Sequence, residues 1–133
     1  MPPDPSRAWA FLPWGYLATI AIELPVLMIG LAPRHDLRTR LLAGVALTAF
    51  TYPIVICVLP PLTWAARCPG WYVPTAELFA AVGECLLFLA AFGRGGDRRS
   101  TWRDAAAIVT ANLLSFLVGE AWSGLGEAWH AWR

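Results

Sequence analysis

Long apolar stretches, each about the length of a membrane-spanning helix, dominate the pattern along the chain. They cover residues 9–32, 37–62, 73–93 and 102–122, and short polar segments separate them. A helix needs about 20 apolar residues to cross the roughly 30 Å of hydrocarbon in a bilayer. The pattern therefore predicts an all-α fold, a transmembrane four-helix bundle. Consecutive helices should run antiparallel because the connections between them are short.

The first stretch has a competing interpretation as a secretory signal peptide. Its apolar run is longer than the core of such a peptide, and no A-x-A cleavage site follows it. We therefore expect a retained helix and a single membrane domain over residues 1–133. Residues 123–133 are predicted to form a short interfacial tail, because Trp122, Leu125, Trp129 and Trp132 recur at helical spacing. A frayed end is the alternative for this tail.

Local signals mark several ends of the predicted helices. Asp36 stands where it can cap the helix that begins at residue 37, since a short acidic side chain accepts hydrogen bonds from a first turn. Thr101 and Asp104 fit the capping box S/T-x-x-D/E ahead of the last apolar stretch. We expect His35 to be a solvated loop residue.

The composition indicates lipid rather than water as the main solvent. Apolar residues make up 58% of the chain and charged residues 14%, against about 25% charged residues in a soluble domain. The net charge of +1 offers no basic field for nucleic acid. The sequence contains no nucleotide-binding, metalloprotease or serine-hydrolase motif. We therefore expect no cofactor, no metal site, no catalytic residues and no nucleic-acid partner.

The positions of the basic residues, which are all arginines, predict the orientation of the chain. The segments after the first and third predicted helices carry seven of them: Arg34, Arg38, Arg40, Arg94, Arg98, Arg99 and Arg103. The other side has three, Arg7, Arg67 and Arg133. Arginine-rich loops stay in the cytoplasm, so both termini are expected outside it. Most tryptophans lie at or beyond the outer ends, which agrees with the preference of indole for the headgroup interface.

Polar residues recur at one depth inside the predicted membrane segments. Each lies about nine to twelve residues from the cytoplasmic end of its helix, which is roughly 13–18 Å and close to the midplane of the bilayer. Helical spacing places Thr48 on the same face as Thr51. Glu77 and Glu120 are predicted to lie at the outer mouth. All four helices thus contribute to a polar mid-membrane layer, formed by Glu23, Thr51, Tyr52, Glu84, Asn112 and Ser115.

The two carboxyl groups in this layer are its most costly members. An acidic residue at the centre of a membrane helix costs about 2.5–3.5 kcal/mol, so Glu23 and Glu84 should face protein or water. No basic residue is predicted at this depth. One or both carboxyls should therefore be protonated and donate hydrogen bonds, or the two should share one proton. Pro25 and Pro53 each remove a helical N–H beside the layer and leave a backbone carbonyl without its usual partner.

Three segments of the chain resemble segments of a known group of membrane proteins. The segments Thr51-Tyr52-Pro53, Ala76-Glu77 with Glu84, and Ala111-Asn112-x-x-Ser115 resemble those of small, uncharacterised bacterial four-helix membrane proteins. The similarity covers roughly residues 44–120. It implies a shared fold but no activity. We expect the chain in a bacterial inner membrane. Glu23 is similar to the early-helix glutamate of small multidrug antiporters, but the rest of their pattern is missing, so drug export is not implied.

Three functions are compatible with these features. The favoured one is an accessory or scaffold subunit of a membrane complex, in which the polar layer holds helices together or contacts a larger subunit. The second is a small proton- or cation-linked transporter or channel, oligomeric because four helices enclose little space, in which Glu23 and Glu84 titrate. The third is a membrane enzyme that uses Glu77 and Glu120 at the outer face. The expected partners are the lipid bilayer and either a larger membrane subunit or further copies of the chain.

Overall fold

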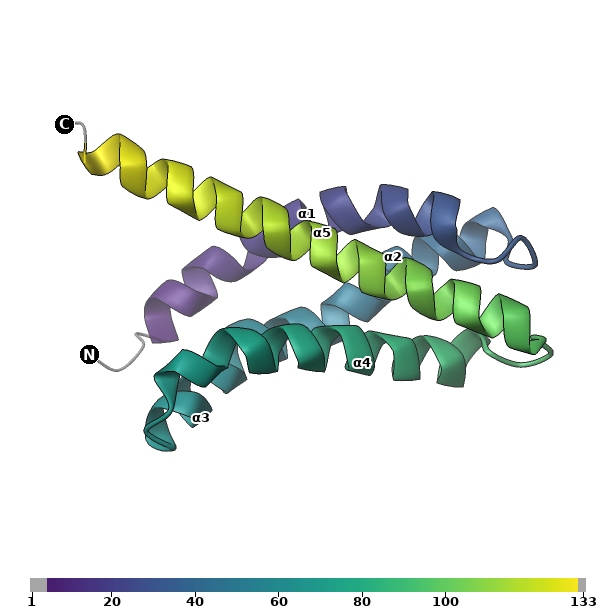
Figure 1. The fold of residues 1–133 in the computed structure, drawn as a ribbon, viewed down its shortest axis with the longest axis horizontal. Coiled ribbons are helices and arrows are strands. Elements are labelled where there is room, and N and C mark those ends of the chain that lie inside the picture. The colour runs from purple at the N-terminus through teal and green to yellow at the C-terminus, as the bar shows by residue number, and fades with distance from the viewer. Residues whose placement is uncertain (1–4, 132–133) are drawn as a thin grey trace.

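The computed structural model describes residues 5–131, and every regular element in that part of the chain is a helix (Figure 1). The elements are α1 (Pro5–Gly30), α2 (Leu37–Pro53), η1 (Ile54–Val58), α3 (Leu59–Ala65), η2 (Pro69–Trp71), α4 (Tyr72–Phe92) and α5 (Arg98–Ala131). Of these, η1 is a π-helix and η2 is a single 3₁₀ turn. The predicted all-α fold is confirmed.

Four helical segments are long and apolar enough to cross a membrane: Trp9–Gly30, Leu37–Ala65, Tyr72–Phe92 and Arg98–Trp122. Large apolar side chains cover their outer surfaces, and Ile29, for example, is 79% exposed. A surface of this kind is unfavourable in water and matches the acyl chains of lipid. The chain is therefore a multi-pass membrane protein, folded as a transmembrane four-helix bundle.

Consecutive spans run antiparallel and occupy the corners of a square. The loops 31–36 and 93–97 lie at one end of the bundle, on the right in Figure 1, whereas the start of α1, the end of α5 and α3 lie towards the other. We call these the loop end and the terminal end. Both α1 and α4 contact α2 and α5, so α1 and α4 stand at opposite corners. A side chain that points inward from α1 or α4 therefore meets α2 and α5.

The second span is interrupted where the sequence predicts one continuous helix over 37–62. α2 ends at Pro53, and η1 and α3 carry the chain on to Ala65. Proline lacks the N–H that an α-helix uses and its ring crowds the preceding turn, so the wider π-turn follows directly. Within η1, the carbonyl of Val55 accepts a hydrogen bond of 3.1 Å from the Tyr72 hydroxyl. The interrupted span is thereby fastened to the start of α4.

Aspartate residues cap the two helices that leave the loop end. Asp36 accepts a hydrogen bond of 2.8 Å from the Thr39 N–H, as predicted. Asp97 accepts hydrogen bonds from the hydroxyl of Ser100 and from its N–H, the latter at 2.8 Å. Hydrogen bonds from the side chain and backbone of Thr39 lower the pKa of Asp36, and those from Ser100 lower the pKa of Asp97 in the same way.

α5 extends beyond the predicted helix 102–122 at both ends. It begins at Arg98, so Thr101 and Asp104 lie inside the helix, and the predicted capping box at these two residues is wrong. At its other end the backbone continues as one helix to Ala131, where the sequence predicts a separate short tail. The first turn is thus capped by Asp97, and Asp104 is released for a different role.

The two helical hairpins carry matching residues at equivalent positions. We call α1 with α2 the first hairpin and α4 with α5 the second. Glu84 follows Glu23 by 61 positions, and Asp97 follows Asp36 by the same 61. The same spacing relates further buried pairs, namely Thr51 and Asn112, Leu27 and Phe88, and Leu47 and Ile108. The two hairpins therefore form an approximate internal repeat.

The apolar core lies in the half of the bundle nearest the loop end. Its largest fully buried apolar side chains are Leu27, Leu31, Phe88 and Ile108. Small residues bring the helix backbones close together there, since a Cβ atom on Gly30 would lie only 2.8 Å from the Cβ of Ala107. Dense packing of this kind excludes water. The loop half of the bundle is therefore closed, and the polar layer lies next to it, on the side of the terminal end.

Candidate functional site

Glu23 links its own helix, α1, to two others. Its Oε2 accepts a hydrogen bond of 2.8 Å from the Thr48 hydroxyl on α2. Its Oε1 accepts one of 2.8 Å from the Ser115 hydroxyl on α5. The side chain is only 2% exposed. Glu23 is therefore held at a fixed place in the centre of the bundle and does not face lipid.

Glu84 does the same from the opposite corner, on α4. Its Oε1 accepts a hydrogen bond of 2.7 Å from the Thr51 hydroxyl on α2, and its Oε2 accepts one of 2.9 Å from Asn112 Nδ2 on α5. It too is 2% exposed. The structure thus brings five of the six residues of the predicted layer into contact: Glu23, Thr51, Glu84, Asn112 and Ser115. Thr48 joins them from the face predicted for Thr51.

The donors around the two carboxyls have a second acceptor on the backbone. The Thr48 hydroxyl lies 3.2 Å from the Gly44 carbonyl, Thr51 lies 3.2 Å from that of Leu47, and Ser115 lies 2.9 Å from that of Asn112. A hydroxyl has one proton, so each donates either to the carboxyl or to the carbonyl. When it donates to the carbonyl, its oxygen is free to accept a hydrogen bond from the protonated carboxyl. The layer can therefore satisfy Glu23 and Glu84 in both their charged and their protonated forms.

No positive charge of the chain balances the two carboxyls at this depth. The sequence has no arginine or lysine between Arg7 and Arg34, between Arg40 and Arg67, between Arg67 and Arg94, or between Arg103 and Arg133. In the part of the chain that the structure describes, neither Glu23 nor Glu84 forms an ion pair. An uncompensated charge in a low-dielectric interior is strongly unfavourable. Each carboxyl therefore needs a proton or an external cation.

Tyr52 lies beside the layer without joining it. Across the described residues, its hydroxyl makes no hydrogen bond to either carboxyl, and it lies against the backbone of α1 at Gly15. A Cβ atom at Gly15 would overlap this hydroxyl, so only glycine leaves room for it. The ring of Tyr52 lies 6.3 Å from that of Tyr16, centroid to centroid. Tyr52 therefore packs beside the layer, between α1 and α2, without a hydrogen bond to it among the described residues.

A cavity of about 710 Å³ opens between the four spans in the terminal half of the bundle. Glu23, Glu84 and their hydrogen-bond partners line its deep part, next to the apolar core. Aromatic side chains from all four spans line the rest, including Phe11, Tyr52, Tyr72 and Phe116. Trp14 and Trp122 also line the cavity and are 73% and 79% exposed. We call this space the terminal cavity; it is mostly apolar and has two carboxyls at its deep end.

Glu77 and Glu120 also line the terminal cavity. Glu77 is half-buried and lies two helical turns from Glu84 on α4, nearer the terminal end, whereas Glu120 is exposed. The predicted outer mouth thus coincides with residues of the cavity wall.

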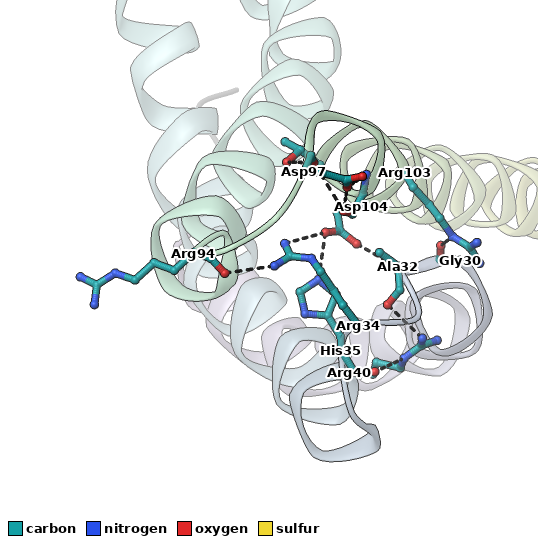
Figure 2. A network of polar contacts seen from close by, with 11 residues as sticks. Gly30, Ala32, Arg34, His35, Arg40, Arg94, Asp97, Arg103 and Asp104 are labelled. Carbon is teal, nitrogen blue, oxygen red and sulfur yellow. Dashed lines mark hydrogen bonds and ion pairs between the residues drawn. The ribbon is translucent and has the colours of Figure 1, made fainter.

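A second polar cluster seals the loop end, and sequence reasoning missed it (Figure 2). Asp104 on α5 is fully buried and accepts three hydrogen bonds: from the Ala32 N–H at 2.7 Å, from His35 Nε2 at 2.9 Å and from Arg34 Nη2 at 3.3 Å. His35 is 8% exposed and packs edge-on against Phe88, so the prediction of a solvated loop residue is wrong. We call Arg34, His35 and Asp104 the loop-end cluster.

Two arginines extend this seal over the last turn of α1. Arg103 donates to the Gly30 carbonyl at 2.9 Å, and Arg40 donates to the carbonyls of Ala32 at 3.1 Å and of Met28. The last carbonyls of a helix have no partner within it and carry partial negative charge, so arginine satisfies both needs. Arg40 and Arg103, whose positions in the sequence predict the orientation of the chain, thus also stabilise the end of α1 (Figure 2).

One signal in the sequence could have revealed Asp104. It lies four residues before Ile108 and eight before Asn112, on the helix stripe that carries the polar layer. Extending that stripe by one turn towards the loop end would have turned Asp104 inward. The chemistry of a cap and that of a buried ion pair are otherwise indistinguishable from residue type alone.

No protein family, curated protein or solved structure matches the chain.

Proposed function

We propose that the protein is a small proton-linked cation transporter that binds its cation in the terminal cavity at Glu23 and Glu84. The observation that carries this proposal is the pair of buried carboxyls at the deep end of a cavity, with no basic residue to balance them. A purely structural polar layer gains about 0.6–2 kcal/mol for each interhelical hydrogen bond. It needs no carboxyl group for that purpose, and it needs no cavity.

The hydrogen bonds of the layer supply a mechanism for exchange. With a cation present, Glu23 is ionised and accepts from the hydroxyls of Thr48 and Ser115. Without it, a proton binds one carboxyl oxygen, and the hydroxyl that faced this oxygen turns to its backbone carbonyl, that of Gly44 for Thr48 or of Asn112 for Ser115. Proton and cation thus compete for one site, because only one of them is needed to balance the charge.

The closed loop end supports a conformation in which this site communicates with the terminal side only. Its apolar core and the loop-end cluster separate the carboxyls from the other face. The arginine-rich loops favour placing that face in the cytoplasm, so the cavity would open outward. Transport requires that the contacts between Asp104 and the loop 31–36 open while the terminal end closes.

The proposal is tested by proton flux in proteoliposomes that carry a pH-sensitive dye inside. An outward proton gradient should drive uptake of an added cation, with Na⁺, K⁺ and tetraethylammonium tried in turn. Glu23→Gln and Glu84→Gln should each abolish the cation-dependent change in internal pH, because an amide cannot bind or release the proton. Flux that persists at wild-type rate in both variants would refute the proposal.

The chain supplies a matched control for these variants. Asp36→Asn and Asp97→Asn make the same change from acid to amide at exposed caps outside the spans. Asparagine caps a helix as well as aspartate does, so both controls should keep wild-type flux. A loss of flux in the controls as well would indicate damage to folding rather than removal of a titrating group.

The scaffold-subunit role favoured by the sequence has one feature in its support. The terminal cavity lies between spans, and a transmembrane helix of a larger subunit could bury its apolar walls. This role predicts that a partner co-purifies in mild detergent and crosslinks to residues at the cavity wall. A purified chain that exchanges protons for cations on its own would exclude it as the main function.

A further inference from the structure

We propose that the terminal cavity takes an organic cation with an aromatic or bulky apolar body, its positive charge held at Glu23 and Glu84. This inference rests on the proposed function and names the class of its substrate. It depends on three properties of the cavity: its size, the chemistry of its walls and the position of its charges.

The size of the cavity suits an organic molecule better than an inorganic ion. Pockets for small organic ligands typically have about 300–1,000 Å³, and the terminal cavity has about 710 Å³. A path for protons or metal ions needs only a chain of polar groups a few ångströms wide. In this bundle the hydrogen-bonded layer lies in the deep part, and beyond it the walls are mostly apolar, with Glu77 and Glu120 as acidic members. The space beyond the layer therefore suits an apolar part of a ligand.

The walls supply the contacts that such a molecule needs. Tyr52 from α2, Tyr72 from the start of α4 and Phe116 from α5 present aromatic rings to the cavity. Aromatic faces attract organic cations and pack against apolar groups. The position of Tyr52 is fixed by its fit against Gly15, and that of Tyr72 by its hydrogen bond to Val55. The walls are therefore preorganised, which reduces the entropic cost of binding.

The charges lie at one end of the cavity, so they also set the orientation of the ligand. Glu23 and Glu84 approach from opposite corners of the bundle and both line the deep part of the cavity, so a cationic group there can lie near both. Glu77, on the same face of α4 and nearer the terminal end, lies on the route inward. The cationic group should therefore point to the deep part and the apolar body to the aromatic walls.

A pair of ions with nearly the same size and shape provides the test. Tetraphenylphosphonium is a cation and tetraphenylborate an anion, and both are apolar apart from their charge. Equilibrium dialysis against protein-loaded and empty nanodiscs measures binding beyond partition into lipid. We expect saturable binding of tetraphenylphosphonium only. Equal saturable binding of tetraphenylborate would overturn the proposal, because the cavity would then select apolar bodies or lipid chains regardless of charge.

The dependence on protons and on the two carboxyls sharpens this test. If one proton leaves for each cation bound, the affinity should fall by about tenfold for each pH unit below the titration of the site. Glu23→Gln or Glu84→Gln should weaken binding by about a hundredfold, the usual effect of removing one member of a desolvated charge pair. Thermal unfolding of each variant, followed by circular dichroism, checks that it is folded. Binding that is unchanged in both folded variants would contradict the proposal.

A third variant separates this inference from the proposed function. Ala80 is half-buried and lines the cavity one helical turn from Glu84, towards the terminal end, so Ala80→Phe fills cavity space and leaves both carboxyls in the chain. It should reduce tetraphenylphosphonium binding at least tenfold, by the steric cost of overpacking. If wild-type protein exchanges Na⁺ or K⁺ for protons but binds no tetraphenylphosphonium, the ligand class is wrong and the transport function stands. If it does neither, both are wrong.

Discussion

The two hairpins of the bundle share their positions for acidic residues and differ in what surrounds them. Glu23 and Glu84 are equivalent, as are the caps Asp36 and Asp97. In the first hairpin, however, the helix after the loop is interrupted by Pro53 and a π-turn, whereas in the second hairpin α5 is continuous. The repeated residues thus build the carboxyl pair, and the differences shape the two ends of the bundle.

At the loop end the difference lies in one residue. The position equivalent to Asp104 in the first hairpin is Ala43, which is buried in the core. Only the second hairpin therefore sends a carboxylate across to the loop of the other, where it holds Arg34 and His35. The carboxylate contact across the loop end is therefore one-sided, because the first hairpin has no counterpart of Asp104.

At the terminal end the difference lies in the backbone. The π-turn after Pro53 forms part of the cavity wall through Val55 and Ile56, where the second hairpin has regular helix. A wider turn displaces the side chains that follow it, and Tyr72 fastens it in that position. The two hairpins therefore contribute to the cavity wall differently, the first through a π-turn and the second through regular helix.

The largest expected effect of a substitution concerns Asp104. Asp104→Ala leaves a buried histidine, a partly buried arginine and the Ala32 N–H without their acceptor. Removal of one member of a buried ion pair costs about 3–5 kcal/mol. Thermal unfolding in detergent, followed by circular dichroism, should show this as a clear loss of stability.

A second variant at the same position, Asp104→Asn, tests whether the shape or the charge of this side chain stabilises the loop end. Its amide oxygen can still accept from the Ala32 N–H, so it should recover part of the lost stability. If Asp104→Ala unfolds at the same temperature as the wild type, the contact of Asp104 with the loop of the first hairpin does not stabilise the fold.

The next largest effect concerns Gly15 and its equivalent, Ala76. Both are buried, but only at Gly15 does a tyrosine hydroxyl occupy the place of a Cβ atom. Gly15→Ala should therefore cost about 1–3 kcal/mol through overpacking. Tyr52→Phe in the same chain should restore part of this loss, since the hydroxyl is the nearest atom. Additive effects of the two substitutions in a double-mutant cycle would contradict the contact.

The general fold could be predicted from the sequence because it depends on few variables. The length and apolarity of a segment decide whether it spans a bilayer, and helical spacing decides which residues share a face. These suffice for the four spans and for the meeting of Glu23, Thr51, Glu84, Asn112 and Ser115. Which residues in that set bond to one another depends on how each helix is rotated about its axis and shifted along it, and a shift of one residue changes the partners. The sequence therefore places Thr48 on the same face as Thr51 but does not predict its hydrogen bond to Glu23.

The loop-end cluster and the cavity depend on tertiary contacts that no local pattern encodes. Asp104 satisfies a helix-cap motif as well as it satisfies an ion pair, and the decision depends on where Asp97 starts the helix. His35 is polar and lies in a loop, so solvent is its ordinary environment; its burial depends on Phe88 from another hairpin. The cavity depends on how far a proline displaces a helix, which residue type alone does not determine.

A smaller effect is expected at the equivalent donors Thr51 and Asn112. Both donate to Glu84, one from each hairpin, at 2.7 and 2.9 Å. Thr51→Val and Asn112→Leu should each lower stability by about 0.6–2 kcal/mol, the usual range for an interhelical hydrogen bond in a membrane. The double variant should deviate from the sum of the two, because both act on one carboxyl. Additive losses in thermal unfolding would show that the two hairpins do not share this site.

The smallest effect concerns the caps, where the hairpins are most alike. Because hydrogen bonds lower the pKa of Asp36 and of Asp97 in the fold, each stabilises the protein above its ordinary pKa of about 3.9. That stability is lost as the pH falls through the lowered values. Asp36→Asn and Asp97→Asn keep the cap but cannot titrate. Between pH 5 and pH 3 the wild type should therefore lose more thermal stability than the double Asn variant, and each single variant should fall midway. If one single variant accounts for the whole difference, the two caps are not equivalent. The hairpins would then share the aspartate at this position but not the stability that it contributes.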